Sequence, residues 1–238
     1  MNLSYSKLNG LRTYVYNSRQ ELIDFAIDKK AILIAINAEK IIKSNDSFQE
    51  LVNNNIGYPD GFGAVWALRK HGFKNVIRTP GCELWLDIIA RYYREKVIYL
   101  VGSKPAVIKK TVDKLHIEFP GINIANFRDG YIKTDKEKED LVKDVIDKQP
   151  DIVFVALGSP KQEIFMIELL EKHPALYMGL GGSFDVYSDY VKRAPLFYRK
   201  MNLEWFYRLL KQPTRIGKSG CQICQHRRTG IMRRRSGI

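Results

Sequence analysis

Short, nearly continuous apolar runs alternate with longer amphipathic stretches through the first 190 residues of the chain. Runs of this kind are typical of strands buried on both faces of a parallel sheet. Five strands are predicted on this basis: Ala31–Asn37, Lys96–Gly102, Gly121–Phe127, Asp151–Gly158 and Ala175–Gly182.

Helical periodicity fills the intervals between these runs. In the stretch that begins at Pro105, the apolar residues Val107, Ile108, Val112 and Leu115 recur at helical spacing. Five helices are predicted: Gly63–His71, Glu83–Arg94, Pro105–Phe119, Lys136–Lys148 and Lys161–Lys172. Strands that alternate with helices of this length indicate βαβ units, so we expect an α/β fold with a Rossmann-like parallel sheet flanked by helices.

The composition of the chain changes near Lys192. We divide it into a Rossmann-like core (1–191), a basic amphipathic C-terminal appendage (192–216) and an irregular basic tail (217–238). The tail has four glycines and no apolar periodicity, so little fixed structure is expected there.

Positive charge is concentrated in the same C-terminal part. The net charge is +13, and residues 192–238 hold 13 Lys and Arg against one acid, Glu204. Such a segment fits an anionic membrane surface, diphosphate groups or nucleic acid, or it only solubilises the protein. Nucleic acid is disfavoured because no stacking aromatic follows Tyr207 and no recognised motif is present.

The ends and the cysteines bear on location and metal binding. The N-terminus is polar and resembles no signal peptide, and no apolar run approaches the roughly 20 residues of a membrane span. A cytoplasmic protein is therefore expected. Cys221, Cys224 and His226 lack the fourth ligand that zinc needs, so their spacing is interpreted as accidental and no metal or cofactor is predicted.

Polar loops follow several of the predicted strands. In an open parallel sheet, ligands bind beyond the carboxyl ends of the strands. Four loops with polar groups should meet there: 37–39, 59–61, 158–163 and 181–185. Their convergence indicates a site, although each loop alone is a weak signal.

The loop Gly158–Glu163 is a candidate anion or nucleotide site. Gly158 allows a sharp turn out of the strand, Pro160 can open a helix, and Lys161 and Gln162 lie beside the free N–H groups of its first turn. Gly182 likewise offers a backbone amide for close approach. An ordinary strand-to-helix turn with a solvated lysine explains the same residues, and no dinucleotide or P-loop fingerprint is present.

Asp60 lies between Pro59 and Gly61, directly before a predicted helix. Three roles are open for such a carboxylate: general base, metal ligand or N-cap of the helix that follows. N-capping is the commonest role of an aspartate in this position.

Six stretches taken together resemble the WecG/TagA/CpsF family of bacterial glycosyltransferases, also called glycosyltransferase family 26. They are INAEKI, YPDGFGAVW, GSPKQEIFM, YMGLGGSFDV, KRAP and LEWFYRLLKQPTRI, in order from about Ile36 to Ile216. The stretches AINAEK and GSPKQEIFM are most similar to the UDP-N-acetylmannosaminuronate transferase branch. Glu83 stands where relatives usually have Asp, and glycines at 217, 220 and 230 interrupt a stretch that is basic helix in relatives.

The resemblance implies an inverting, metal-independent transfer from a UDP-sugar to a sugar on undecaprenyl diphosphate. Asp60 falls on the proposed general base, and Arg78 and Gln162 match pocket residues. Asn37 and Asp185 are expected to touch the donor, and Arg208 and Arg215 belong to the appendage that would fold over the active site. The residues expected to bind substrate are Asn37, Gly158, Lys161, Gly182, Asp185, Arg193, Arg208 and Arg215.

The resemblance also implies a location and a product. The basic appendage would hold the enzyme on the inner face of the plasma membrane, where a lipid-linked acceptor waits. The product would be a cell-surface polysaccharide of the enterobacterial common antigen type. A related donor, UDP-N-acetylmannosamine or UDP-glucose, is the alternative, and a homo-oligomer is left open.

Overall fold

The computed structural model describes residues 2–191. The appendage and tail predicted at 192–216 and 217–238 lie outside the described residues, and the three-part division of the chain stays a prediction.

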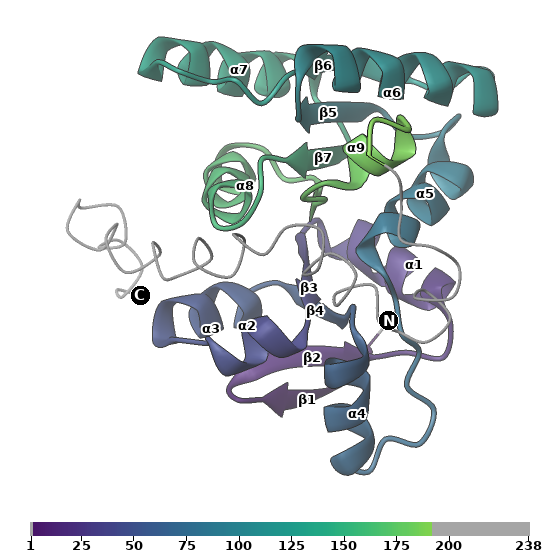
Figure 1. Ribbon diagram of the computed structural model, residues 1–238, viewed down its shortest axis with the longest axis vertical. Helices are drawn as coiled ribbons and strands as arrows, with labels where there is room; N and C mark the ends of the chain where they lie inside the picture. The colour runs from purple at the N-terminus through teal and green to yellow at the C-terminus, as the bar shows by residue number, and fades with distance from the viewer. Residues whose placement is uncertain (1, 192–238) are drawn as a thin grey trace.

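A six-stranded parallel sheet forms the centre of the described part (Figure 1). Its strand order is β4-β3-β8-β7-β5-β6. The bounds are β3 Ile32–Ile36, β4 Ile56–Pro59, β5 Ile98–Gly102, β6 Ile124–Arg128, β7 Ile152–Ala156 and β8 Leu176–Gly179. The predicted α/β class and parallel sheet are confirmed.

Helices cover both faces of this sheet. One core cluster joins the sheet to α1 (Arg19–Lys29), α5 (Gly81–Tyr92), α6 (Pro105–Glu118) and α9 (Ser183–Tyr187). The other joins it to α3 (Asp46–Asn53), α4 (Phe62–Lys70), α7 (Asp135–Lys148) and α8 (Lys161–Lys172). The short helix α2 (Ala38–Ile42) connects β3 to α3.

The alternation of side chains along a strand explains the two clusters. In β7, Ile152 and Phe154 belong to the first cluster, whereas Val153 and Val155 belong to the second. All four are fully buried, as the continuous apolar run predicts for a central parallel strand.

The last strand of the sheet differs from the prediction. The stretch Gly121–Phe127 was expected to be buried on both faces, but β6 is an edge strand with several exposed side chains, and it begins only at Ile124. Gly121 has a positive φ of 85°, so a turn occupies the predicted strand start.

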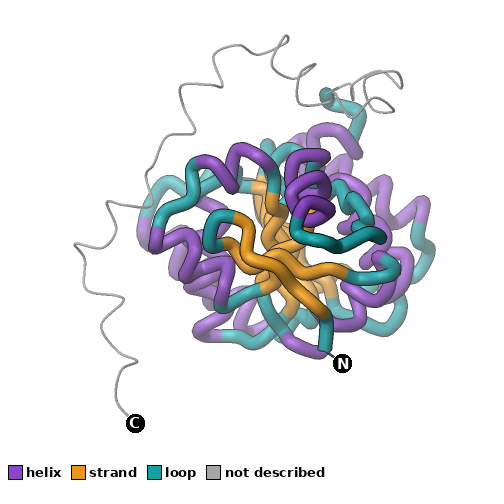
Figure 2. Tube along the Cα trace, turned by 90° about the horizontal axis from the view of Figure 1, so that it is seen from below, coloured by secondary structure: helices purple, strands orange, loops and turns teal. Residues whose placement is uncertain are grey.

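An antiparallel hairpin precedes the sheet and was not predicted. Strands β1 (Ser4–Leu8) and β2 (Leu11–Val15) pair with each other, and Figure 2 shows the strands of the chain viewed from below. The side chain of Asn53 fastens β2 to the end of α3, because its Oδ1 accepts a hydrogen bond from the Arg12 N–H at 2.8 Å.

The direction in which the chain moves across the sheet from one strand to the next is opposite after β5 and after β7. From β5 it passes through α6 to β6, at the outer edge, whereas from β7 it passes through α8 to β8, towards the centre. Because α6 and α8 lie in different core clusters, they cover opposite faces. The crevice between the carboxyl ends of β5 and β7 is therefore a topological switch point, where open α/β sheets bind ligands.

Candidate active site

The loop that carries Asp60 leaves the edge strand β4 and is held by backbone hydrogen bonds on two sides. The N–H of Asp60 donates to the carbonyl of Ile36 at 3.0 Å, and the N–H of Thr79 donates to the carbonyl of Pro59 at 2.8 Å. The loop is thus tied both to the end of β3 and to the segment that precedes α5.

The Asp60 side chain contacts the N-terminus of a distant helix. Its Oδ1 accepts a hydrogen bond at 2.8 Å from the N–H of Gly81, the first residue of α5. The N-cap of the following helix α4 is Gly61, which makes no side-chain cap, so the N-cap reading of Asp60 is wrong for that helix. A helix N-terminus attracts negative charge, which fits a carboxylate here.

Two buried tyrosines lie behind this carboxylate. The Tyr58 hydroxyl has no hydrogen-bond partner among the described residues. Burial raises the pKa of Tyr58 well above 10, and the charge of Asp60 raises it further. Burial also raises the pKa of Tyr16, whose hydroxyl donates to Oγ1 of Thr79 at 2.6 Å. Both phenols therefore stay neutral at physiological pH.

Arg78 directly precedes Thr79 in the segment that is bonded to the Asp60 loop. It is half-buried, and its neighbour Thr79 makes the backbone bond to Pro59 described above. Glu83 lies on α5 and forms an ion pair with Arg19 at 2.9 Å.

The end of β3 presents Asn37 next to the Asp60 loop. A Cβ added to Gly61 would lie 3.6 Å from the Asn37 Cβ. The Asn37 Oδ1 accepts a hydrogen bond from the Lys40 N–H at 2.9 Å and thereby caps α2. The Nζ of Lys40 lies 3.2 Å from Oε1 of Glu163.

Gln162 and Glu163 begin the first turn of α8 and are both buried. Gly158 has a positive φ of 76°, which confirms the predicted sharp turn out of β7. The Gln162 Oε1 accepts a hydrogen bond at 3.0 Å from the N–H of Gly181, in the loop after β8. The pair therefore connects the end of β7 to the ends of β8 and β3.

Asp185 lies on α9, whose N-cap is Gly182. Its Oδ1 accepts a hydrogen bond from the Ser103 hydroxyl at 3.1 Å, which connects α9 to the end of β5. The Trp85 ring makes edge contacts with Phe184 and Tyr187, so aromatic packing fixes α9 in place.

These contacts form a row along the carboxyl ends of β4, β3, β8, β7 and β5. The structure therefore places eight of the predicted residues on the side of the sheet where the strands end: Asn37, Asp60, Arg78, Gly158, Lys161, Gln162, Gly182 and Asp185. The three predicted arginines, Arg193, Arg208 and Arg215, lie outside the described residues.

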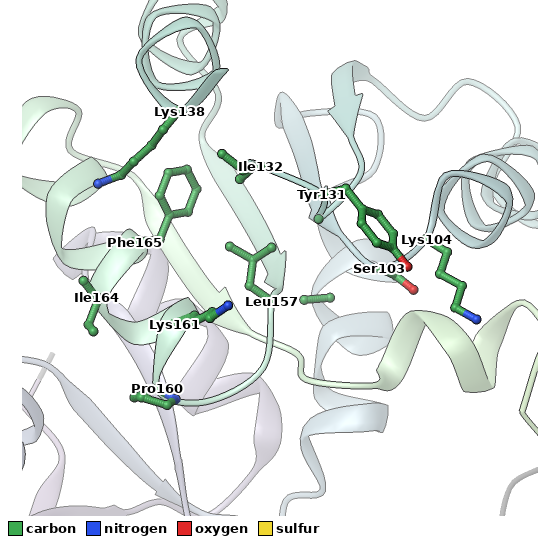
Figure 3. Close-up of a pocket in the computed structure, with 12 residues that line it drawn as sticks. Ser103, Lys104, Tyr131, Ile132, Lys138, Leu157, Pro160, Lys161, Ile164 and Phe165 are labelled. Atoms are coloured by element: carbon green, nitrogen blue, oxygen red, sulfur yellow. The ribbon is translucent and has the colours of Figure 1, made fainter. Parts of the chain in front are cut away.

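A cavity of about 650 Å³ opens at the switch point between β5 and β7 (Figure 3). Three lysines line it, together with an exposed tyrosine and several apolar side chains. Lys104 is the N-cap of α6, Lys138 lies on α7 and Lys161 begins α8. The lining residues are Ser103, Lys104, Gly130, Tyr131, Ile132, Lys138, Ala156, Leu157, Pro160, Lys161, Ile164 and Phe165.

The lysines of the cavity differ in their partners. The Lys104 Nζ donates to the Tyr190 hydroxyl at 2.9 Å, and this bond raises the pKa of Lys104. Lys138 forms an ion pair with Glu168 on α8. Burial works against ionisation of Glu168, but the bonds and charges of Lys138 and Lys172 outweigh it and lower the pKa of that carboxyl.

Sequence reasoning missed part of this site. It named no residue after β5 or β6, although Ser103 and Tyr131 could have been found by applying the strand-end rule to those two strands. The ion pair between Lys40 and Glu163 had no sequence signal, because its partners are 123 positions apart.

In residues 2–191, no group of three or more His, Cys, Asp or Glu side chains gathers in a way that could hold a metal ion. None of the helices described in that range combines the length and the apolarity that crossing a bilayer requires.

A comparison with protein families agrees with the geometry. The model of the glycosyl transferase WecG/TagA/CpsF family matches residues 9–222, which is most of the chain. The family implies an enzyme that uses a UDP-sugar donor and a lipid-linked acceptor in cell-surface polysaccharide synthesis. The chain therefore belongs to the WecG/TagA/CpsF family of glycosyltransferases.

Proposed function

We propose that this enzyme transfers N-acetylmannosaminuronate from its UDP-sugar to N-acetylglucosamine on undecaprenyl diphosphate. The transfer inverts the anomeric configuration and uses no metal. Support comes from the similarity of AINAEK and GSPKQEIFM to the corresponding transferase branch. The alternative is a family member with UDP-N-acetylmannosamine or UDP-glucose as donor, which serves teichoic acid, capsule or exopolysaccharide synthesis.

In this proposal the donor lies across the carboxyl ends of the strands. Its UDP part occupies the cavity between β5 and β7, where Tyr131 offers a ring for the uracil and Lys161 a charge for the diphosphate. From β7 to β4 the sheet spans three strand spacings, about 14 Å. An extended nucleotide sugar can bridge this distance, so its anomeric carbon reaches the loops of Asn37 and Asp60.

Asp60 acts as the general base. It removes the proton of the acceptor hydroxyl while that oxygen attacks the anomeric carbon from the face opposite UDP. The new C–O bond forms as the bond from the anomeric carbon to the diphosphate oxygen breaks. The bonding pair leaves with UDP, and Asp60 keeps the proton until solvent removes it. The Gly81 N–H holds the carboxylate in one orientation for this step.

Negative charge develops on the departing diphosphate and requires cationic groups. Two such groups, Arg78 and Lys161, belong to the segments that follow the strand ends. In the proposal the C-terminal part adds three more: Arg193, Arg208 and Arg215. Guanidinium groups suit this task because they bind phosphate oxygens in a bidentate manner. The basic appendage would also hold the enzyme on the inner face of the plasma membrane.

The row of contacts from Asp60 to Ser103 is the observation that carries this proposal. A carboxylate held by a hydrogen bond and a basic cavity large enough for a nucleotide both lie at the carboxyl ends of the strands. A carboxylate at the amino ends of the strands would have contradicted the mechanism.

The test is transfer by the purified full-length protein with UDP-N-acetylmannosaminuronate and a lipid-diphosphate-linked N-acetylglucosamine. Asp60→Asn should lower kcat by about 10²- to 10⁴-fold while the protein stays folded, since its amide oxygen can still accept the Gly81 hydrogen bond but cannot act as the base. Asp113→Asn, on the exposed side of α6, is the matched control. Full activity of Asp60→Asn would contradict the mechanism, and a panel of UDP-sugars would identify the donor.

A further inference from the structure

Helix α4 presents an aromatic and basic stripe to solvent. Phe62 and Trp66 are each 54% exposed and lie one helical turn apart on the same face. Lys70 continues the stripe, with its Nζ 5.6 Å from the centre of the Trp66 ring. The opposite face of α4, with Ala64, Val65 and Leu68, is buried in the core. Within residues 2–191, core packing thus accounts for only one face of α4.

The stripe begins next to the proposed catalytic base. Phe62 is two residues after Asp60, and the helical rise places Trp66 about 6 Å and Lys70 about 12 Å farther along the axis. Gly63 lies so close to Ala38 that an added Cβ would come within 2.8 Å of the Ala38 Cβ, so α4 is packed tightly on α2. The position of the stripe relative to Asp60 is therefore rigid.

Basic residues adjoin the stripe along the chain. Residues 61–82 contain four Lys and Arg and no acidic residue, in a body that is otherwise almost neutral. Arg69, Lys70 and Lys74 of this segment are exposed. Aromatic rings flanked by basic side chains are the combination that binds the interface of an anionic bilayer.

We propose that the α4 stripe, formed by Phe62, Trp66 and Lys70, is a membrane contact in the body of the enzyme, additional to the basic C-terminal part. Its rings enter the headgroup region of an anionic bilayer while Arg69 and Lys74 bind lipid phosphates. This contact rests on the proposed function in one respect only: it would bring Asp60 close to an acceptor whose lipid is held in the membrane.

A second copy of the chain fits the same surface less well. In a two-fold dimer the same patch meets itself. Two α4 stripes would then bring Arg69, Lys70 and Lys74 of each copy together, and like charges in such an interface are unfavourable. An anionic lipid surface complements the same charges.

Tryptophan fluorescence can detect this contact directly. The chain has three tryptophans, of which Trp85 is fully buried and Trp205 lies outside the described residues. In a full-length Trp205→Phe variant, Trp66 is the tryptophan that can meet lipid, and Trp85 is an internal reference. Vesicles of phosphatidylcholine and phosphatidylglycerol in equal parts, with brominated acyl chains, should shift its emission to the blue and quench it.

The added substitution Trp66→Phe should abolish that quenching. Phe62→Ser, in the otherwise native chain, should weaken vesicle binding by about tenfold, because an exposed ring no longer becomes buried in lipid. Ile117→Ser on α6 is the control, since it also removes an exposed apolar side chain, which is 78% exposed. Vesicle binding by this variant should equal that of the native protein.

Three results would overturn the proposal. One is binding to vesicles without quenching of Trp66, which would leave the contact to other segments. Another is equal loss of binding in Ile117→Ser. The third is a lipid-independent change in Trp66 emission with a doubled mass in light scattering, which would assign the stripe to a second copy. Because vesicle binding is measured without substrates, its outcome is separate from that of the transfer assay.

Discussion

The ion pair between Lys40 and Glu163 joins α2, which follows β3, to the first turn of α8. The Glu163 side chain is 2% exposed and that of Lys40 is 20% exposed. Besides Lys40, Oε1 of Glu163 accepts hydrogen bonds from the Ser159 hydroxyl at 3.0 Å and from Gln162 Nε2 at 3.5 Å. Oε2 is buried without a partner among the described residues.

Lys40→Met removes the ion-pair partner of this buried carboxylate. Breaking a buried pair by deleting one partner costs about 3–5 kcal/mol, and the partial exposure of Lys40 places the loss near the lower end. Glu163→Gln keeps the hydrogen-bonding shape and leaves a lysine that can reach water, so it should cost about 1–2 kcal/mol. The double variant buries no unpaired charge and should recover about 2 kcal/mol relative to Lys40→Met.

Urea unfolding of the four proteins gives each free energy by linear extrapolation and completes a double-mutant cycle. Lys40→Arg is the conservative control, since it keeps the charge. The reasoning is refuted if Lys40→Met costs less than about 1 kcal/mol, or if the double variant is less stable than Lys40→Met. Because Glu163 adjoins Gln162, Lys40→Met should also lower kcat, and Lys40→Arg should restore it.

Three further predictions concern the cavity and its surroundings. Gly102→Ala should destabilise the protein by about 3 kcal/mol in urea unfolding, because its φ is +124° and the new Cβ would lie 2.4 Å from the Ala156 carbonyl oxygen. Gly121→Ala, with φ +85° and open space around it, should cost only about 1 kcal/mol, and equal losses would contradict the steric argument. Tyr131→Ala should weaken UDP binding about tenfold in calorimetry, because the uracil loses its stacking partner. Tyr5→Ala on the hairpin is the control and should leave the affinity unchanged. Unchanged affinity of Tyr131→Ala would contradict stacking of the uracil on this ring. Glu168→Gln should destabilise the protein at neutral pH, and the difference from the native protein should shrink below about pH 4.5. The reason is that the pKa of Glu168 is lower in the folded than in the unfolded protein. Its carboxylate therefore stabilises the fold above the unfolded pKa, and this stabilisation is lost as the pH falls through the folded pKa. Denaturation at neutral pH and at about pH 3 checks this, and a constant difference would contradict it.

The central elements were predictable because their signals are local. The runs around Ile34, Leu100 and Phe154 are apolar at every position, since parallel strands are covered on both faces. Helices with clear periodicity, such as α6, were predicted to within one residue of their observed ends. A short strand such as β4, with only four residues that include Gly57 and Pro59, has no such signal.

The hairpin was missed although Asn9–Gly10, with φ values of 47° and 80°, forms the two-residue turn between its strands, and such a pair indicates a hairpin. The strands themselves give a weaker signal. β1 reads SYSKL and is mostly polar, because it is exposed except at its end, where Leu8 is buried against α4 and β2. No alternation of apolar and polar residues marks such a strand. Its position depends on a partner strand and on a side-chain contact from Asn53, which lies far along the chain.

The sequence alone determined which residue types stand at the ends of the strands: an aspartate between Pro59 and Gly61, and Gln162 behind the Gly158 turn. The parallel sheet then requires the carboxyl ends of the strands to lie together, because strands of the same direction end on the same side of the sheet. Tertiary structure alone decided what each group meets. Asp60 receives its hydrogen bond from Gly81 rather than from its own helix, and Glu163 pairs with Lys40. Packing of α5 on the sheet and of α2 on α4 brings these distant residues within bonding distance.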